Sequence, residues 1–474
     1  MPVKQRTRRT GKNRTGIIRQ VRTSSAIILC RLARRLMHLA GKGGTTLPGR
    51  IALLLDKEIL STVSRGMHIV LVTGTNGKTT TCRMLEQALI LEGKKCLLNR
   101  SGANLLPGIT AEFVCNADRT GKPRCDYAVT ECDEGALKQI TQRLKPEIIV
   151  VTNLFRDQLD RYGEVMNTRE EILKGIRKAP QSILCLNADC VLSSAMSAGL
   201  PNPTGYFGID TPVGDQGERE LSDAKYCLFC GTELVYHYHT YAHLGDYECP
   251  ACGYRRPSPE TSLTEITGTG AASSEARMRI RDENLAVTIS LPAVYNLYNA
   301  LAAACAGVKL GLKTKSITRA LETVEAPFGR MEHFTIGGCS IRMILVKNPA
   351  GCNQAMEYIA GTGEDYGIVF CLNDRTADGH DISWIWDTDP EQILLDPHKK
   401  SVWVSGTRAE DMQLRLKYSG APEESITLEK DYSRLLDEVV RREKQVFLLP
   451  NYTSMLDLRQ VLLQKAGGNA FWKG

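Results

Sequence analysis

The stretch VLVTGTNGKTTT at residues 70–81 constrains the fold most, because it joins an apolar strand to a helix through a glycine-containing turn. Such a turn brings backbone N–H groups and a helix amino terminus close to phosphate oxygens. Lys78 can neutralise the β- and γ-phosphates, and the Thr79 hydroxyl can ligate Mg²⁺. Val72 replaces the first glycine of the fuller G-x-x-x-x-G-K-[ST] pattern, so the loop is a variant. The pattern predicts ATP binding by Thr75, Asn76, Gly77, Lys78, Thr79 and Thr80.

An acidic partner for the metal is expected at the end of a neighbouring strand. The stretch DYAVTECDE ends a predicted strand with Glu131, and Asp133 and Glu134 follow closely. A carboxylate there can hold the Mg²⁺ that bridges nucleotide phosphates. The position at the strand end favours Glu131. The choice between Glu131 and Glu134 stays open, since one of these acids could cap the next helix.

Alternating strand and helix patterns predict an α/β fold with two main domains. Strands HIVLVTG, KKCLLN, DYAVTE, EIIVVTN and SILCLNAD are separated mostly by helical segments, which is the rhythm of a parallel sheet covered on both faces. After a Pro- and Gly-containing boundary near residue 328, four further strands predict a smaller α/β domain. The predicted division is a tail and helix over 1–47, a central domain over 48–328 and a carboxy-terminal domain over 329–474.

Four cysteines interrupt this rhythm in an insertion over residues 222–256. CLFCG and CPACG form two C-x2-C pairs eighteen residues apart, the spacing of a structural zinc ribbon. The predicted ligands are Cys227, Cys230, Cys249 and Cys252. With four thiolates the site is closed, which favours a structural role. His237, His239 and His243 lie between the pairs, either as alternative ligands or as ordinary loop histidines.

The amino terminus is strongly basic. Eight Lys or Arg residues crowd the first 22 positions and predict an unstructured tail, followed by a helix over residues 25–40. Ile28, Leu32, Leu36 and Leu39 share one face of that helix. The helix either packs on the protein body or contacts an anionic membrane surface. No aromatic-basic platform for nucleic acid, membrane span or secretory signal is visible, so we expect a cytoplasmic protein, with the inner membrane face as an option.

Several motifs together resemble the Mur ligase family of ATP-dependent ligases. They are GTNGKTT, VVTNLFRDQLDRYGE, LCLNADC, LPAVYNLYNALAA and FGRMEH. The resemblance implies that Asn296 contacts adenine and that Arg330 contacts the nucleotide from the hinge. The departures are informative: Gln158 stands where those ligases have a metal-binding histidine, Tyr295 replaces another histidine, and no separate amino-terminal UDP-binding domain is expected.

The carboxy-terminal segments LVKNPAGCNQAM and LNDRTADGHDISWIWD, with the cysteine insertion, resemble the MurT family in particular. Its members are ligase-like subunits of lipid II isoglutaminyl synthase. This likeness implies ATP-dependent amidation of the α-carboxylate of D-glutamate in the stem peptide of lipid II, with ammonia from a GatD-type class I glutamine amidotransferase. It also implies that Asp381 orients the catalytic histidine of that partner, with Asp378 as the alternative. Trp384 and Trp386 are either partner contacts or core residues.

The implied chemistry agrees with the residues. A carboxylate does not react with ammonia, but ATP can convert it to an acyl phosphate that ammonia attacks. No nucleophile elbow of a glutaminase is visible, and Cys352 is best explained as a buried structural thiol. Two other functions remain as alternatives: an amino-acid ligase of the Mur or folylpolyglutamate type, and a non-catalytic ATP-binding scaffold that activates a partner.

Overall fold

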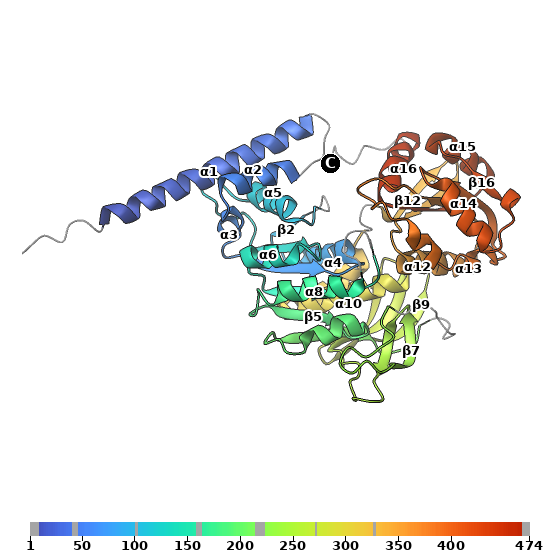
Figure 1. The fold of residues 1–474 in the computed structure, drawn as a ribbon, viewed down its shortest axis with the longest axis horizontal. Coiled ribbons are helices and arrows are strands. Elements are labelled where there is room, and N and C mark those ends of the chain that lie inside the picture. The colour runs from blue at the N-terminus through green and yellow to red at the C-terminus, as the bar shows by residue number, and fades with distance from the viewer. Residues whose placement is uncertain are drawn as a thin grey trace, which may run out of the picture.

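A computed structural model describes residues 9–39, 46–99, 103–157, 164–213, 223–270, 273–325 and 329–466. Two sheets organise the chain, one of nine strands and one of six. In Figure 1 the carboxy-terminal sheet and its helices lie to one side of the central sheet, and helix α1 extends along the other. Gln158, most of the RDQLDRYGE segment and residues 326–328, which include the first residue of the FGRMEH motif, fall outside the described residues.

The central sheet has the strand order β11-β10-β9-β6-β5-β4-β1-β3-β2. Its strands are β1 (His68–Thr73), β2 (Cys96–Leu98), β3 (Tyr127–Glu131), β4 (Ile148–Val151), β5 (Ile183–Asn187), β6 (Thr204–Ile209), β9 (Thr261–Thr269), β10 (Ser274–Ile280) and β11 (Glu283–Ile289). Pairings from β2 to β9 are parallel, whereas β10 is antiparallel to both its neighbours. The predicted parallel α/β fold is confirmed, with an antiparallel edge added.

Helices enclose this sheet and connect its strands. They are α2 (Thr46–Leu55), α3 (Ile59–Val63), α4 (Lys78–Leu91), α5 (Leu106–Asn116), α6 (Leu137–Leu144), α8 (Val165–Ile176), α9 (Val191–Ser194), α10 (Val294–Lys309) and α11 (Thr314–Thr323). Strand β1 is buried from its second residue onward, as the run IVLVT predicts for a strand covered on both faces. Because β1 lies between β3 and β4, its carboxyl end opens between theirs, and that edge carries the candidate site.

The second sheet has the order β12-β13-β17-β14-β15-β16. It comprises β12 (Arg330–Ile336), β13 (Cys339–Ile344), β14 (Tyr366–Cys371), β15 (Lys399–Ser405), β16 (Ile426–Leu428) and β17 (Gln445–Pro450), with helices α12 (Pro349–Ala360), α13 (Glu391–Leu394), α14 (Ala409–Tyr418), α15 (Tyr432–Arg442) and α16 (Tyr452–Lys465). Val402 and Val404 of β15 join one apolar cluster while Trp403 joins another. The sheet is therefore covered on both faces. The second α/β domain is confirmed, and β12 and β16 join the four strands that the sequence predicts.

Helix α1 (Arg9–Leu39) corrects the expectation of an unstructured tail over residues 1–22. Extending an existing helix adds a hydrogen bond for each residue ordered. The basic segment from Arg9 onward therefore extends the predicted apolar helix toward the amino terminus. The helix packs on the body through Thr23, Ala26, Ile27 and Cys30, which are buried. Residues 1–8 lie outside the described part, and none of the described helices is long and apolar enough to cross a membrane.

Candidate active site

The turn between β1 and α4 holds Lys78 in a buried position at the first turn of the helix. Its ammonium group donates hydrogen bonds to the Gly74 carbonyl at 2.5 Å and to the Glu134 carboxylate at 2.8 Å. Burial alone would lower the pKa of Lys78, but the carboxylates of Glu134, Glu131 and Asp133 outweigh it and raise this pKa above its ordinary value. Lys78 therefore carries a fixed positive charge at the mouth of the loop.

Thr79 and Glu131 form a second pair beside Lys78. The Thr79 hydroxyl donates to the Glu131 carboxylate at 2.6 Å. The Glu131 backbone is held in turn by Asn99, whose side chain accepts from its N–H and donates to its carbonyl. A hydroxyl and a carboxylate oxygen at the carboxyl edge of a parallel sheet are ligands of the kind that Mg²⁺ prefers. Since Glu134 is engaged by Lys78, the geometry favours Glu131 for that role.

The loop is held in shape by the end of strand β4. The Thr75 N–H donates to the Asn153 carbonyl, and the Asn153 side chain accepts from the Asn76 N–H, both at 2.9 Å. The Thr152 hydroxyl donates to the Asn76 carbonyl at 2.7 Å. These bonds satisfy loop backbone groups from a neighbouring strand, so the loop is preorganised.

Gly77 is required for two reasons. Its φ of +87° lies in the left-handed region that favours glycine. A Cβ atom there would also stand 1.9 Å from the Asn299 side-chain oxygen. Asn299 is buried on α10, which packs against α4. The glycine therefore lets the helix that follows the loop approach α10 closely.

We expect Gly77→Ala to destabilise the loop by about 1–3 kcal/mol and to weaken ATP binding, because it adds both backbone strain and a clash. Gly93→Ala is the matched control, since Gly93 has a φ of +70° but no atom lies within 4 Å of the point where its Cβ would stand. Thermal unfolding and calorimetric titration with ATP would measure the difference. Equal effects from both variants would show that the contact with Asn299 is unimportant.

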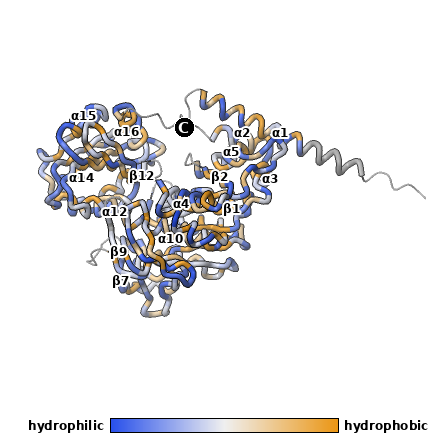
Figure 2. The backbone as a smooth tube through the Cα atoms, turned by 180° about the vertical axis from the view of Figure 1, so that it is seen from behind, coloured by the Kyte–Doolittle hydropathy of each residue, from blue (hydrophilic) through white to orange (hydrophobic). Residues whose placement is uncertain are grey.

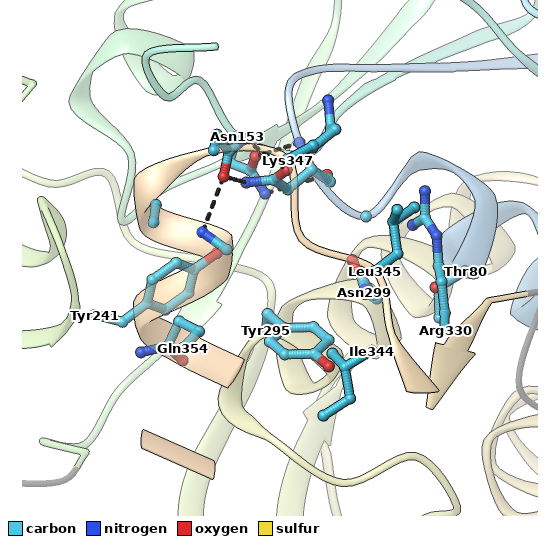
Figure 3. Close-up of a pocket in the computed structure, with 15 residues that line it drawn as sticks. Thr80, Asn153, Tyr241, Tyr295, Asn299, Arg330, Ile344, Leu345, Lys347 and Gln354 are labelled. Carbon is cyan, nitrogen blue, oxygen red and sulfur yellow. Dashed lines mark hydrogen bonds between the residues drawn. The ribbon is translucent and has the colours of Figure 1, made fainter. Parts of the chain in front are cut away.

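A pocket opens beside this loop and is lined by both domains. The central domain contributes Asn76, Gly77, Thr80, Asn153, Tyr241, Tyr295 and Asn299, and the carboxy-terminal domain contributes Arg330, Ile344, Leu345, Lys347, Asn348, Ala350, Gly351 and Gln354. Figure 3 shows the rings of Tyr241 and Tyr295 on one side of this space and Arg330 on the other. Polar groups of the loop and two aromatic faces thus share one concave site.

Direct bonds join the two domains at the pocket. The Asn348 side chain donates to the Asn76 side-chain oxygen at 3.1 Å while it also caps helix α12. The Lys347 ammonium is paired with Asp157, which follows β4. The carboxy-terminal domain therefore contacts the loop between β1 and α4 directly. A ligand bound in the pocket would touch both domains.

The predicted nucleotide residues do not all line this pocket. Asn76, Gly77, Thr80 and Arg330 do, whereas the lining does not include Thr75, Lys78, Thr79 and Asn296. Asn296 is buried, and its side chain donates to the Pro292 carbonyl and accepts from Asn299. Its assignment to adenine stays a prediction. Sequence reasoning missed Tyr241, which comes from the cysteine insertion, because nothing in the chain order indicates that this insertion folds back against the loop.

The four cysteines of the insertion come together as predicted. Cys227 and Cys252 have sulfur atoms 3.6 Å apart, Cys230 and Cys249 have theirs 3.4 Å apart, and all four lie within 4.8 Å of one another. Gly231 and Gly253 each follow a C-x2-C pair with positive φ, which closes both turns tightly. Four converging thiolates fit a tetrahedral Zn²⁺.

A hairpin of β7 (Val235–Tyr241) and β8 (Leu244–Glu248) connects the two cysteine pairs. None of its histidines joins the cysteine group among the described residues, which agrees with four thiolate ligands. His243 is nevertheless no ordinary loop residue: it is fully buried beside Phe155, and burial lowers its pKa to about 4. Tyr241 stacks on the same Phe155 ring, so the hairpin tip is part of the core beneath the pocket.

We expect loss of the metal to have two effects: it destabilises the cysteine insertion, and it lowers the affinity for ATP. The Cys249→Ser variant should lose zinc and loosen the hairpin that carries Tyr241. Loss of the aromatic contact between Tyr241 and ATP, about 1 kcal/mol, corresponds to roughly fivefold weaker ATP binding. Metal content and ATP titration would be measured, with Cys125→Ser as the control because Cys125 lies outside the cluster. Unchanged ATP affinity in a zinc-free variant would contradict this coupling.

The two candidate acids of the carboxy-terminal loop differ in their surroundings. Asp378 accepts hydrogen bonds from the Thr453 N–H at 2.7 Å and from its hydroxyl at 2.5 Å, and burial raises its pKa. Asp381 is partly exposed and accepts from the Ser383 N–H at 2.8 Å. Asp378 is thus bound to the body of its own domain, while the Asp381 carboxylate bonds only within its own loop among the contacts of the described residues.

The two tryptophans of this loop differ in their exposure to solvent. Trp384 packs against the apolar cluster of the second sheet, whereas Trp386 is 47% exposed and meets Tyr418 edge-on at a ring separation of 5.7 Å. Trp384 is therefore a partly buried residue at the edge of the core. The other stands with Tyr418 on the surface, a few residues along the chain from Asp381, where it can contact a partner.

Comparisons with known proteins agree with this architecture. Residues 72–227 match the Mur ligase middle domain, and residues 345–455 match the MurT ligase C-terminal family. Among solved structures, a pseudomurein peptide ligase type C from Methanothermus fervidus superposes with a TM-score of 0.62 at 21% identity, covering 84% of this chain and 79% of that one. The MurF ligase from Thermotoga maritima in complex with ADP gives 0.60 at 14% identity, covering 87% and 84%. The fold is that of the Mur ligases.

Curated relatives narrow the class further. The MurT subunit of lipid II isoglutaminyl synthase (glutamine-hydrolyzing) from Streptococcus pneumoniae is 36% identical over 93% of this chain and 95% of its own length. The MurT subunit from Staphylococcus aureus strain COL is 34% identical over 93% of this chain and 98% of its own length. Within the Mur ligase class, the chain belongs to the MurT family.

Proposed function

We propose that this chain is the synthase subunit of a lipid II isoglutaminyl synthase. It amidates the α-carboxylate of D-glutamate in the stem peptide of lipid II, using ATP and ammonia. The observation that carries the proposal is the likeness to MurT subunits across both sheets, together with the charged loop of Lys78, Thr79 and Glu131 at a pocket between the domains. The alternative, an amino-acid ligase, would need a site for a second amino acid, and the MurT likeness over both domains favours ammonia instead.

The reaction has two steps. The carboxylate oxygen attacks the γ-phosphorus of ATP, the bond from that phosphorus to the bridging oxygen breaks, and ADP leaves. Ammonia then attacks the carbonyl carbon of the acyl phosphate, phosphate leaves, and loss of a proton gives the amide. Lys78 and the loop N–H groups stabilise negative charge on the transferred phosphoryl group.

Thr79 and Glu131 fit the metal that such a step uses. Their oxygens would hold Mg²⁺, which when bound neutralises phosphate charge and orients the γ-phosphate. Arg330 reaches the pocket from the first strand of the second domain and would contact the nucleotide there. Cys227, Cys230, Cys249 and Cys252 would hold a structural Zn²⁺.

Ammonia would come from a separate glutaminase of the GatD type. Asp381 would complete that partner's catalytic group by orienting its histidine, since an acid beside the imidazole sets its tautomer. The partly exposed position of Asp381, compared with the internally bonded Asp378, supports this assignment. Trp386 and Tyr418 offer aromatic contact area for the partner.

The test is an amidation assay with the purified chain, ATP, Mg²⁺ and lipid II. Ammonium chloride and glutamine are supplied separately, each with and without a co-expressed glutaminase, and mass spectrometry detects the conversion of carboxylate to amide. We expect amide from ammonia with the chain alone, and from glutamine only with the partner. Incorporation of an amino acid in place of ammonia, or ATP binding without amide under any condition, would overturn the proposal.

A further inference from the structure

Helix α1 has a buried inner face and an apolar outer face that is exposed. The inner face, at the spacing i, i+3, i+4 and i+7, consists of Thr23, Ala26, Ile27 and Cys30, all buried. The outer face consists of Ile28, Leu32, Leu36 and Leu39, at i, i+4, i+8 and i+11, and these side chains are 51%, 49%, 58% and 85% exposed. A surface helix normally presents polar residues to water on its outer face, so this outer stripe needs an explanation.

The position of the helix makes the stripe accessible. In both overall views α1 stands at the outer edge of the molecule, with α2 and α5 on its inner side, and Figure 2 shows hydrophobic turns along its coloured part. Val21 lies on the same face, about two helical turns before Ile28, and is 60% exposed. The stripe therefore runs for about five turns along one side of the helix.

Positive charge lies beside the carboxyl-terminal half of the stripe. A hollow beside the end of α1 is lined by Arg31, Arg34, Arg35, His38, Leu39, Cys115 and Arg124, and none of these residues is acidic. Arg34 pairs with Glu112 of α5, whereas Arg35 and Arg124 have exposed side chains. Thirteen Lys or Arg residues and no Asp or Glu precede Asp56, and Asp56 itself is buried against Thr23.

We propose that the outer face of α1 is a docking surface for an anionic lipid bilayer, with the helix lying in the plane of the interface. The leucines and Ile28 would enter the boundary between headgroups and acyl chains, while the flanking arginines contact lipid phosphates. The absence of acids from the first 55 residues favours a negatively charged surface over a mixed-charge protein partner. The inference concerns binding alone and does not depend on the proposed reaction.

Vesicle sedimentation with the full chain tests the proposal. Vesicles of phosphatidylcholine alone are compared with vesicles that also contain phosphatidylglycerol, at low and high salt. We expect binding to the anionic vesicles that weakens with salt. The double variant L32S/L36S should lower it roughly a hundredfold, because each leucine contributes about tenfold, and Arg35→Glu should lower it roughly tenfold.

Matched controls separate the helix from general surface effects. Leu395→Ser changes an 83%-exposed leucine of the carboxy-terminal domain, and Arg441→Glu reverses an exposed arginine of α15, so both should bind vesicles like the parent. In addition, Leu36→Trp should show a blue-shifted emission change on mixing with anionic vesicles that the parent lacks. Circular dichroism and thermal unfolding verify that each variant is folded.

Three results would overturn the proposal. The first is parent-like binding by L32S/L36S, which would assign any binding to the basic residues of the first 22 positions rather than to the stripe. The second is equal binding to neutral and anionic vesicles. The third is a stripe variant that changes the molar mass in solution by light scattering but leaves vesicle binding intact, which would make the stripe an interface between copies of this chain.

Discussion

Replacing Lys78 with alanine is expected to lower the rate of amide formation roughly a thousandfold with either nitrogen source, because the γ-phosphoryl group loses its buried countercharge. The ammonium group is fixed by Gly74 and Glu134, so the positive charge of the loop is tied to this one position. Amide formation from lipid II, ATP and ammonium chloride, followed by mass spectrometry, measures the effect.

Folding must be measured separately for this variant, because removal of Lys78 leaves the Glu134 carboxylate buried without its cation. The double variant K78A/E134Q removes both charges and should fold better while remaining inactive. Lys138→Ala is the control, since Lys138 is exposed on the nearby helix α6. Full amide formation by a folded Lys78→Ala protein would favour a scaffold that only activates its partner.

The variant Asp381→Asn is expected to lower amidation with glutamine as the nitrogen source but not with ammonia. With the glutaminase partner present, glutamine-dependent amidation should fall by roughly a thousandfold or more, because an amide cannot hold the partner's histidine in the required tautomer. Ammonia-dependent amidation should stay at the parent level, since the Asp381 carboxylate bonds within its own loop and, among the described residues, makes no contact with Lys78, Thr79 or Glu131. Both rates are measured on the same preparation.

The variant Asp378→Asn tests whether Asp378, rather than Asp381, is the acid that orients the partner's histidine. Its carboxylate holds Thr453 at the start of α16, so we expect a lower unfolding temperature and a smaller effect on glutamine use. Glu424→Gln, an exposed change in the same domain, should leave both rates unchanged. If Asp378→Asn, and not Asp381→Asn, removed glutamine-dependent activity from a folded protein, Asp378 would be the orienting acid.

Much of the site was predictable because its parts are local in the chain. A strand, a glycine turn and a helix start are consecutive, so Lys78 and Thr79 had to lie together at one helix end. An acid from the end of the neighbouring strand was predictable because parallel strands bring their carboxyl ends to one edge, although the choice between Glu131 and Glu134 stayed open. The cysteine pairs were predictable because their spacing sets the geometry of two knuckles.

Other features depended on contacts between distant segments. The packing of α4 against the end of β3 decided how the acids are paired. Glu134 pairs with Lys78, and Glu131 pairs with Thr79. The position of Tyr241 in the pocket depends on the folding back of the cysteine insertion. The hydrogen bond from Asn348 to Asn76 depends on how the two domains pack against each other.

Sequence patterns were sufficient for most central strands, the charged loop and the cysteine cluster, because periodicity and short spacing are local properties. They did not indicate β12, β16 or the antiparallel edge of the central sheet. The sequence also placed Ile28, Leu32, Leu36 and Leu39 on one helical face. That this face points outward follows from the packing of the whole domain, since α2 and α5 accommodate the opposite face, which consists of Thr23, Ala26, Ile27 and Cys30. Burial is a property of the whole packing arrangement, and a single helical pattern cannot specify it.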